Sequence, residues 1–163
     1  MIDAESREPR EVNGAGLRPI DEWECQQVVL RFTAHFDVFE HEEMERYFAP
    51  DGVWYQALGP ICGIEELRAR MRGLSREQVM RHVLTNLRTT FISDDESAVD
   101  SYFTVYHEKW ADGQGTRESP MPTYGPRNIG RYHDRLRRIV GRWLIYERRV
   151  TFDLRVQNGS TGG

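Results

Sequence analysis

The sequence has few cysteines and lacks the motifs of common cofactor sites. Cys25 and Cys62 are the 2 cysteines of the chain, and neither lies in a CxxC pair or beside a histidine cluster. We therefore expect reduced thiols rather than a disulfide framework or a zinc site. A P-loop, a GxGxxG fingerprint, a GxSxG elbow and an HExxH motif are also missing. Any chemistry is expected from side chains alone, without a metal or another cofactor.

Long apolar runs and an excess of positive charge are missing too. The first residues, MIDAESREPREVNGAG, lack the apolar region of a signal peptide. No stretch approaches the apolar length that spans a membrane. The formal net charge of −4 argues against nucleic acid, which requires a basic surface. These features favour a cytoplasmic protein without a membrane or nucleic-acid partner.

Apolar residues at helical spacing predict about three helices in the first half of the chain. The first is expected to begin at Asp21, with Glu24 three residues later completing a capping box. A short helix follows His41 and is expected to stop at the turn signal PDG of residues 50–52. Gly73 ends the third helix.

The second half changes to the pattern of β-strands. Long strands are expected over 79–92, 98–110, 129–140 and 143–152, with a tight connection at Gly141. Helices followed by an antiparallel meander are typical of an α+β fold with helices on one face of a curved sheet. The sheet and helices are expected to form a cone that encloses a pocket, for which the aromatic content of 11% supplies apolar walls.

One domain, residues 19–155, accounts for these elements. The charged segment 1–18 and the glycine-rich tail 156–163 are expected to be flexible. The glycine- and proline-rich segment 111–128 is predicted to be a mobile connection that closes over the pocket.

Asp37 and His82 are the candidate catalytic residues. Asp37 lies near the end of the first helix, on a stripe beside the apolar one. His82 shares one face of its strand with Leu84 and Asn86, a mixed face that suits a pocket wall. Histidine moves protons near neutral pH, and a carboxylate on one ring nitrogen leaves the other as the base. The alternatives are an exposed Asp at the helix end and a structural histidine.

Four polar residues are candidate ligand contacts: Tyr55, Asn86, Tyr132 and Arg148. The tyrosines are candidates to donate hydrogen bonds to a ligand, and Arg148 is a candidate to neutralise a ligand anion. The alternatives are tyrosines at the edge of the core and an arginine on a solvated strand face.

Five segments together resemble the SnoaL-like proteins of the nuclear transport factor 2-like superfamily. They are FTAHFD (32–37), FAPDGVW (48–54), RHVLTN (81–86), GRYHD (130–134) and RWLIYER (142–148). The resemblance covers roughly residues 20–153 and implies the cone-shaped fold.

The resemblance also implies roles for individual residues. In scytalone dehydratase and bile acid 7α-dehydratase, which belong to this superfamily, an Asp and a His at the positions of Asp37 and His82 form the catalytic pair. Tyr55 matches a substrate-binding tyrosine, and Arg148 a C-terminal arginine.

The sequence departs from these dehydratases at two places. Their first-helix tyrosine is a phenylalanine here, Phe32 or Phe36 depending on the enzyme that is aligned. Their further acid or base on the second long strand has no clear equivalent, because Val105 and Tyr106 occupy that region.

These observations predict a cofactor-free lyase or isomerase, of dehydratase or cyclase type, acting on a small apolar or aromatic carbonyl metabolite. One alternative is the non-catalytic small (beta) subunit of a ring-hydroxylating dioxygenase, whose end resembles residues 148–153. Another is a ligand-binding module without turnover. A homodimer or homotrimer through the outer face of the sheet is also expected.

Overall fold

The computed structural model describes residues 18–110, 120–123 and 125–155. The predicted arm, apart from Arg18, and the predicted tail lie outside this part, as do residues 111–119 and 124 of the predicted mobile connection. The described helices are α1 (Pro19–Asp37), α2 (His41–Glu45) and α3 (Gly63–Arg72). The described strands are β1 (Phe48–Tyr55), β2 (Ile61–Cys62), β3 (Gln78–Phe91), β4 (Glu96–Lys109), β5 (Asn128–Ile139) and β6 (Arg142–Arg155).

The six strands form one curved sheet in the order β2-β1-β6-β5-β4-β3. Neighbouring strands pair antiparallel except β1 and β6, which run parallel. The predicted α+β fold and its antiparallel meander, β3 to β6, are confirmed, and β1 adds a parallel pairing with β6. The chain crosses from β1 through α3 to β3 at the far edge, so the final strand returns beside β1 in the same direction.

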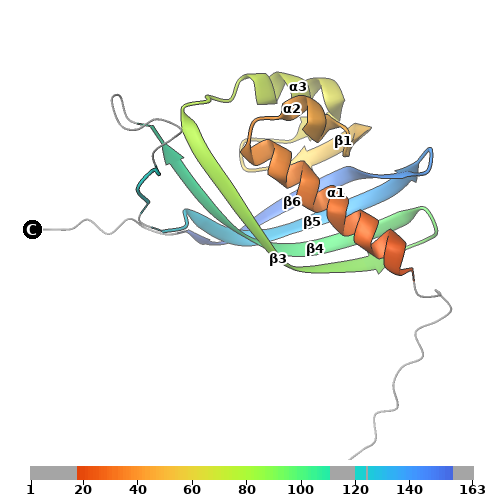
Figure 1. The fold of residues 1–163 in the computed structure, drawn as a ribbon. Helices are drawn as coiled ribbons and strands as arrows, with labels where there is room; N and C mark the ends of the chain where they lie inside the picture. Colours follow the sequence, from red (N-terminus) through yellow and green to blue (C-terminus); the bar gives the residue numbers. More distant parts are fainter. Residues whose placement is uncertain (1–17, 111–119, 124, 156–163) are drawn as a thin grey trace, which may run out of the picture.

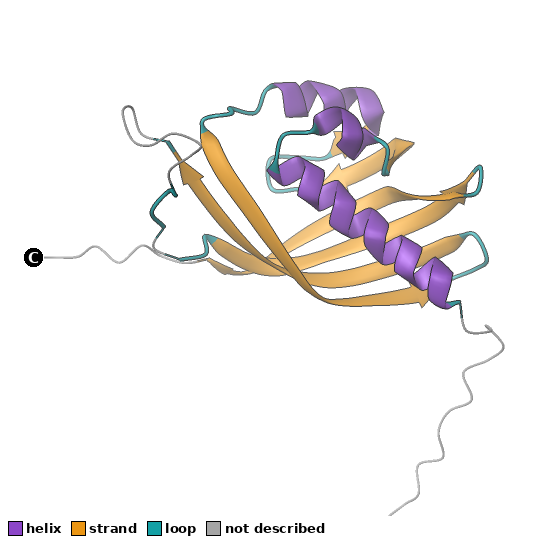
Figure 2. Cartoon of the chain, in the orientation of Figure 1, coloured by secondary structure: helices purple, strands orange, loops and turns teal. Residues whose placement is uncertain are grey.

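All three described helices pack on one side of the sheet, and the other side is bare of them (Figure 2). The core lies between the two layers. Its α1 side contains Val29 and Phe32, and its sheet side contains Phe48 and Ile145, all at most 2% exposed. Burying such a side chain contributes about 1.5–3 kcal/mol. This core fixes α1 across the concave face of the sheet.

Helix α1 begins earlier than the sequence predicts. Arg18 precedes the first helical residue, and no side chain caps the helix. Pro19 occupies the first turn, where its fixed φ suits a helix and its missing N–H costs nothing. Asp21 therefore lies inside the helix, and its carboxylate accepts hydrogen bonds from the side chains of Arg138 and Trp143. The predicted capping box is wrong because proline starts the helix.

The PDG segment at 50–52 does not end an element but lies within β1. From Phe48 to Val53 the strand advances five residues while β6 advances only from Ile145 to Glu147. This irregularity accommodates a proline, which has no N–H for the ladder. Gly52 is required here, because a Cβ atom would lie 2.8 Å from the Phe48 ring.

Candidate active site

Asp37 and His82 are joined by two hydrogen bonds. The Asp37 Oδ1 atom lies 2.6 Å from the His82 Nδ1 atom, and Oδ2 accepts a hydrogen bond of 2.6 Å from the His82 backbone N–H. Both side chains are 8% exposed. The predicted contact between the carboxylate and the imidazole is confirmed. We call these two residues the dyad.

The ends of two elements bring the dyad together. Asp37 is the last residue of α1, where the partial negative charge of a helix C-terminus disfavours a carboxylate unless it is hydrogen-bonded. His82 lies on β3, against which α1 packs. With Nδ1–H directed at the carboxylate, Nε2 is the nitrogen left to accept a proton. No described residue hydrogen-bonds to Nε2.

Aromatic rings surround the imidazole. The ring centroids of Phe36, Phe103 and Tyr132 lie 5.7, 6.1 and 6.3 Å from that of His82. Tyr132 is 4% exposed, and burial raises the pKa of its phenol. The Tyr132 hydroxyl therefore stays protonated near neutral pH and is available as a hydrogen-bond donor beside the imidazole.

A second His–Asp pair differs from the dyad in its exposure to water. On the outer face of the sheet, His133 Nδ1 lies 2.7 Å from Asp100 Oδ1, but these side chains are 46% and 39% exposed. Water competes with such an exposed pair. The dyad is removed from water, so its hydrogen bonds act in a lower dielectric.

Arg148 faces the interior, but its charge is already neutralised. Its Nε and Nη2 atoms lie 2.6 and 2.9 Å from the two carboxylate oxygens of Asp134, and Nη1 donates to Thr33 at 3.2 Å. The guanidinium also lies 4.3 Å from the Tyr132 ring centroid. The structure thus brings Arg148 next to Tyr132 as a supporting residue and does not leave its charge unpaired for a ligand anion.

Asn86 and Tyr55 are not brought together with the dyad. Asn86 has a φ of 53° and is exposed at a bulge, where β3 advances from Thr85 to Arg88 while β4 advances only two residues. The extra residue breaks the alternation, so the predicted shared face of His82 and Asn86 is wrong. Tyr55 is 36% exposed, and Arg149 covers its ring at 4.0 Å.

Two residues of the interior escaped the prediction although alternation indicates them. Trp54, the neighbour of Tyr55, is 5% exposed and packs against Phe32 and Phe36. Its Nε1 atom is buried without a hydrogen-bond partner. Because successive strand residues face opposite sides, an outward Tyr55 implies an inward Trp54.

His107 is the second such residue. It lies two residues beyond Val105, the register partner of His82, and therefore on the same face of the sheet. Its Nε2 lies 2.7 Å from Gln78 Oε1, and its Nδ1 accepts from Arg127 at 3.3 Å. Burial, aided by the charge of Arg127, lowers the pKa of His107. The sequence analysis found no acid or base at Val105 and Tyr106 on this strand. The structure places a second histidine, His107, one position further along it.

A cavity of about 590 Å³ lies beside the aromatic group, between β1 and α3. Phe36 and Trp54 form its wall on the side of the dyad, and Met71 and Leu74 add apolar surface. The Phe36 ring is close to both, with its centroid 5.7 Å from that of His82 and 5.6 Å from that of Trp54. Phe36 therefore lines this cavity and also lies beside the imidazole, which is not among the lining residues.

The described residues contain no group of three or more His, Cys, Asp or Glu side chains placed to hold a metal ion. Within the same residues, no helix is both long and apolar enough to cross a membrane. What the site contains is a buried carboxylate–imidazole pair, a protonated phenol and aromatic walls. Such a set can remove a proton from a bound molecule and stabilise the anion that forms.

The curved sheet and the helices that cover one face of it are the architecture of the nuclear transport factor 2-like, or cystatin-like, class of folds. A family model described as "SnoaL-like domain" matches residues 19–149. The chain belongs to this SnoaL-like family. No protein with a curated description matches it significantly.

Solved structures support the same fold. A protein of unknown function with a cystatin-like fold from Nostoc punctiforme is 26% identical, with a TM-score of 0.66 over 84% of this chain and 94% of that one. A putative scytalone dehydratase from Novosphingobium aromaticivorans is 19% identical, with a TM-score of 0.67 over 84% and 87%. A hexachlorocyclohexane dehydrochlorinase (LinA) Type2 is 13% identical, with a TM-score of 0.63 over 85% and 93%.

Proposed function

We propose that this chain is a cofactor-free lyase or isomerase that removes a proton from a small, mostly apolar carbonyl compound. The observation that carries the proposal is the buried double hydrogen bond between Asp37 and His82. It fixes the ring orientation and leaves Nε2 among aromatic side chains. SnoaL-like family membership and the fold shared with proteins named as a dehydratase and a dehydrochlorinase support a reaction of this kind.

In the proposed reaction, His82 Nε2 takes the proton from the carbon next to the carbonyl group. The electron pair of the broken C–H bond moves to the carbonyl oxygen, and the Tyr132 hydroxyl donates a hydrogen bond to the developing enolate. Asp37 stabilises the imidazolium that forms. In a dehydration, the enolate then expels hydroxide from the next carbon, and the proton on His82 completes the departing water. In an isomerisation, the proton returns to another carbon of the conjugated system. In a ring closure, the enolate carbon attacks a second carbonyl group of the substrate, and the proton on His82 goes to the oxygen of that group.

The surroundings of the dyad favour an apolar or aromatic substrate. Phe36, Phe103 and Tyr132 surround the imidazole, and the cavity behind Phe36 has Trp54 and Met71 in its walls. A substrate in this cavity would approach His82 past the Phe36 ring. Another solved structure of this fold, from Catenulispora acidiphila, is a complex with S-DNPA, which supports a ligand site in this chain.

The test is proton exchange in D₂O, because it requires neither the natural substrate nor a completed reaction. A panel of aromatic and alicyclic ketones and β-hydroxyketones is incubated with the protein, and loss of the α-proton signal is followed by NMR. The wild-type protein should accelerate exchange for part of the panel. His82→Gln should lower that rate by about 10²–10⁴-fold, because Gln cannot take a proton near pH 7.

His133→Gln is the matched control, since it removes the exposed imidazole of the second His–Asp pair and should keep the rate. Asp37→Asn should also be severe, and the double variant should be little worse than the worse single variant, because both residues act as one unit. If His82→Gln lowers the melting temperature but keeps its rate per folded molecule, His82 is structural. The chain would then be a binding module or a non-catalytic subunit.

A further inference from the structure

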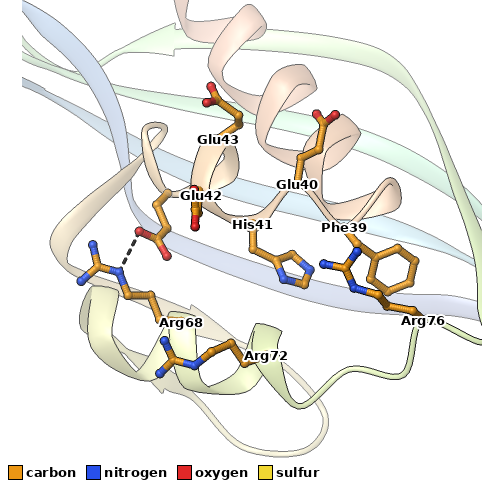
Figure 3. A pocket seen from close by; sticks show the side chains of 9 residues that line it. Phe39, Glu40, His41, Glu42, Glu43, Arg68, Arg72 and Arg76 are labelled. Atoms are coloured by element: carbon orange, nitrogen blue, oxygen red, sulfur yellow. Dashed lines mark hydrogen bonds and ion pairs between the residues drawn. The ribbon is translucent and has the colours of Figure 1, made fainter.

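A second cavity, of about 640 Å³, lies between α2 and α3 (Figure 3). Glutamates and His41 line its α2 side, and arginines line its α3 side. The dyad is not among its lining residues. Its charged groups have no part in the proposed proton transfer, so their arrangement calls for another explanation.

Most carboxylates around this cavity are already paired with cations. The closest pairs are His35–Glu40 at 2.8 Å, Arg46–Glu43 at 3.0 Å and Arg68–Glu45 at 2.8 Å. Figure 3 shows Glu40 and Glu43 pointing away from α3. Glu42, which is exposed, is the lining carboxylate for which the described residues provide no cation within 4.0 Å. Of the three arginines in the lining, Arg68 is the one that these carboxylates pair.

Two arginines on that side lack a carboxylate partner. Within the described residues, no Asp or Glu oxygen lies within 4.0 Å of the guanidinium of Arg72 or of Arg76. The Arg76 guanidinium points toward His41 and Phe39 in Figure 3. Both arginines are exposed, so their side chains can reorient toward a ligand without disturbing the core.

His41 adds a polar atom that has no partner. Its Nε2 is shielded from solvent and makes no hydrogen bond. A buried nitrogen without a hydrogen-bond partner has lost its contact with water and has no protein group in its place, which is uncommon in native proteins. Burial, followed by the charge of Arg76, lowers the pKa of His41, whereas Glu45 acts in the opposite direction. An anion placed beside Arg76 would accept a hydrogen bond from this ring.

We propose that the cavity between α2 and α3 is a binding site for an oxyanion, either a phosphate or a carboxylate group. Arg76 and His41 form its primary contacts. Arg72, whose guanidinium lies on the side of Arg68 in Figure 3, is exposed and can turn toward the site from the last turn of α3. Arginine suits this task because its planar group donates two parallel hydrogen bonds to such oxygens. The site does not include the dyad, so the proposal does not depend on the proposed reaction.

The experiment follows the His41 imidazole signals by NMR while inorganic phosphate or acetate is added at constant ionic strength. Binding should shift these signals in a saturable way and raise the pKa of His41, because a bound anion stabilises the imidazolium. Arg76→Gln should weaken the binding by about tenfold or more, the scale of one charge-assisted hydrogen bond, and Arg72→Gln should weaken it less. Arg88→Gln, an equal change of charge on β3, should have no effect.

The two additives distinguish the sources of the anion. Saturation with phosphate alone assigns the site to phosphorylated ligands, and saturation with acetate alone assigns it to carboxylates. Saturation with neither overturns the proposal. Equal weakening by Arg88→Gln and Arg76→Gln also overturns it, because the effect would then reflect net charge. Circular dichroism of each variant verifies that the fold is retained.

Discussion

Arg148 is a single residue on which the interior depends. It is 1% exposed, its bidentate partner Asp134 is 0% exposed, and its guanidinium lies over the rings of Phe32 and Tyr132 at 4.6 and 4.3 Å. Removing two charges from water is costly, and only good geometry and additional hydrogen bonds offset the cost. Both are present here, so the pair holds Tyr132 beside the dyad.

Replacing Arg148 with Met should destabilise the protein strongly. The change leaves the Asp134 carboxylate buried without its partner, which costs about 3–5 kcal/mol in the free energy of unfolding. Urea denaturation measures this cost. Arg149→Met is the matched control: Arg149 is exposed and paired with Glu147, and an exposed ion pair contributes about 0–1 kcal/mol. Similar losses in the two variants would contradict the assigned role of the buried pair.

Among the elements, the β5–β6 hairpin has a turn residue, Val140, that does not suit its backbone conformation. Val140 and Gly141 form its two-residue turn, with φ of 48° and 75°. Two positive φ values are typical of a type I′ turn, in which Asn-Gly is the favoured pair. A β-branched residue is strained in this region of φ, and Val140 gains no burial in return because it is 97% exposed.

Val140→Asn should therefore stabilise the protein by about 1 kcal/mol, because asparagine tolerates the left-handed conformation that valine resists. Differential scanning calorimetry should show a melting temperature several degrees higher. Gly141→Ala tests the same geometry in the opposite direction and should lower it. If Val140→Asn is neutral or destabilising, the turn does not hold the conformation described here.

The long strands were predictable because alternation and β-branched residues are local signals. The expected strand at 79–92 is Gln78–Phe91 in the structure, and the neighbouring long strands agree closely too. The bulge at Asn86 was not predictable, since an extra residue is recognised only when the partner strand is known. The contact between Asp37 and His82 was predicted from the sequence, whereas the bulge led to Asn86 being assigned to the same strand face as His82.

At the scale of the whole molecule, the order of the strands depends on contacts between distant segments. Nothing local to Phe48–Tyr55 indicates that this strand lies beside the last one, so the parallel pair was missed. Fold class was accessible because helices preceding strands limit the possible layers. The resemblance of five short segments supplied the cone shape, which periodicity alone does not specify.

We also expect self-association through the outer face of the sheet. No described helix covers this face, and Val83 and Tyr102 are 50% and 51% exposed there. Sedimentation velocity over a range of concentrations should show a dimer or trimer, and Tyr102→Glu should shift it toward the monomer. Ile92→Glu, at the β3–β4 turn, should not. A monomer at every concentration would exclude this interface.

The parallel pairing of β1 with β6 also determines how late in synthesis the sheet can be completed. Synthesis delivers the helices and β1 early, but β1 meets its long partner only when residues 142–155 have left the ribosome. Until then its unpaired edge and the apolar side of α1 remain open to wrong contacts. Until β6 has been made, the nascent chain thus has its helices without a complete sheet to pack against.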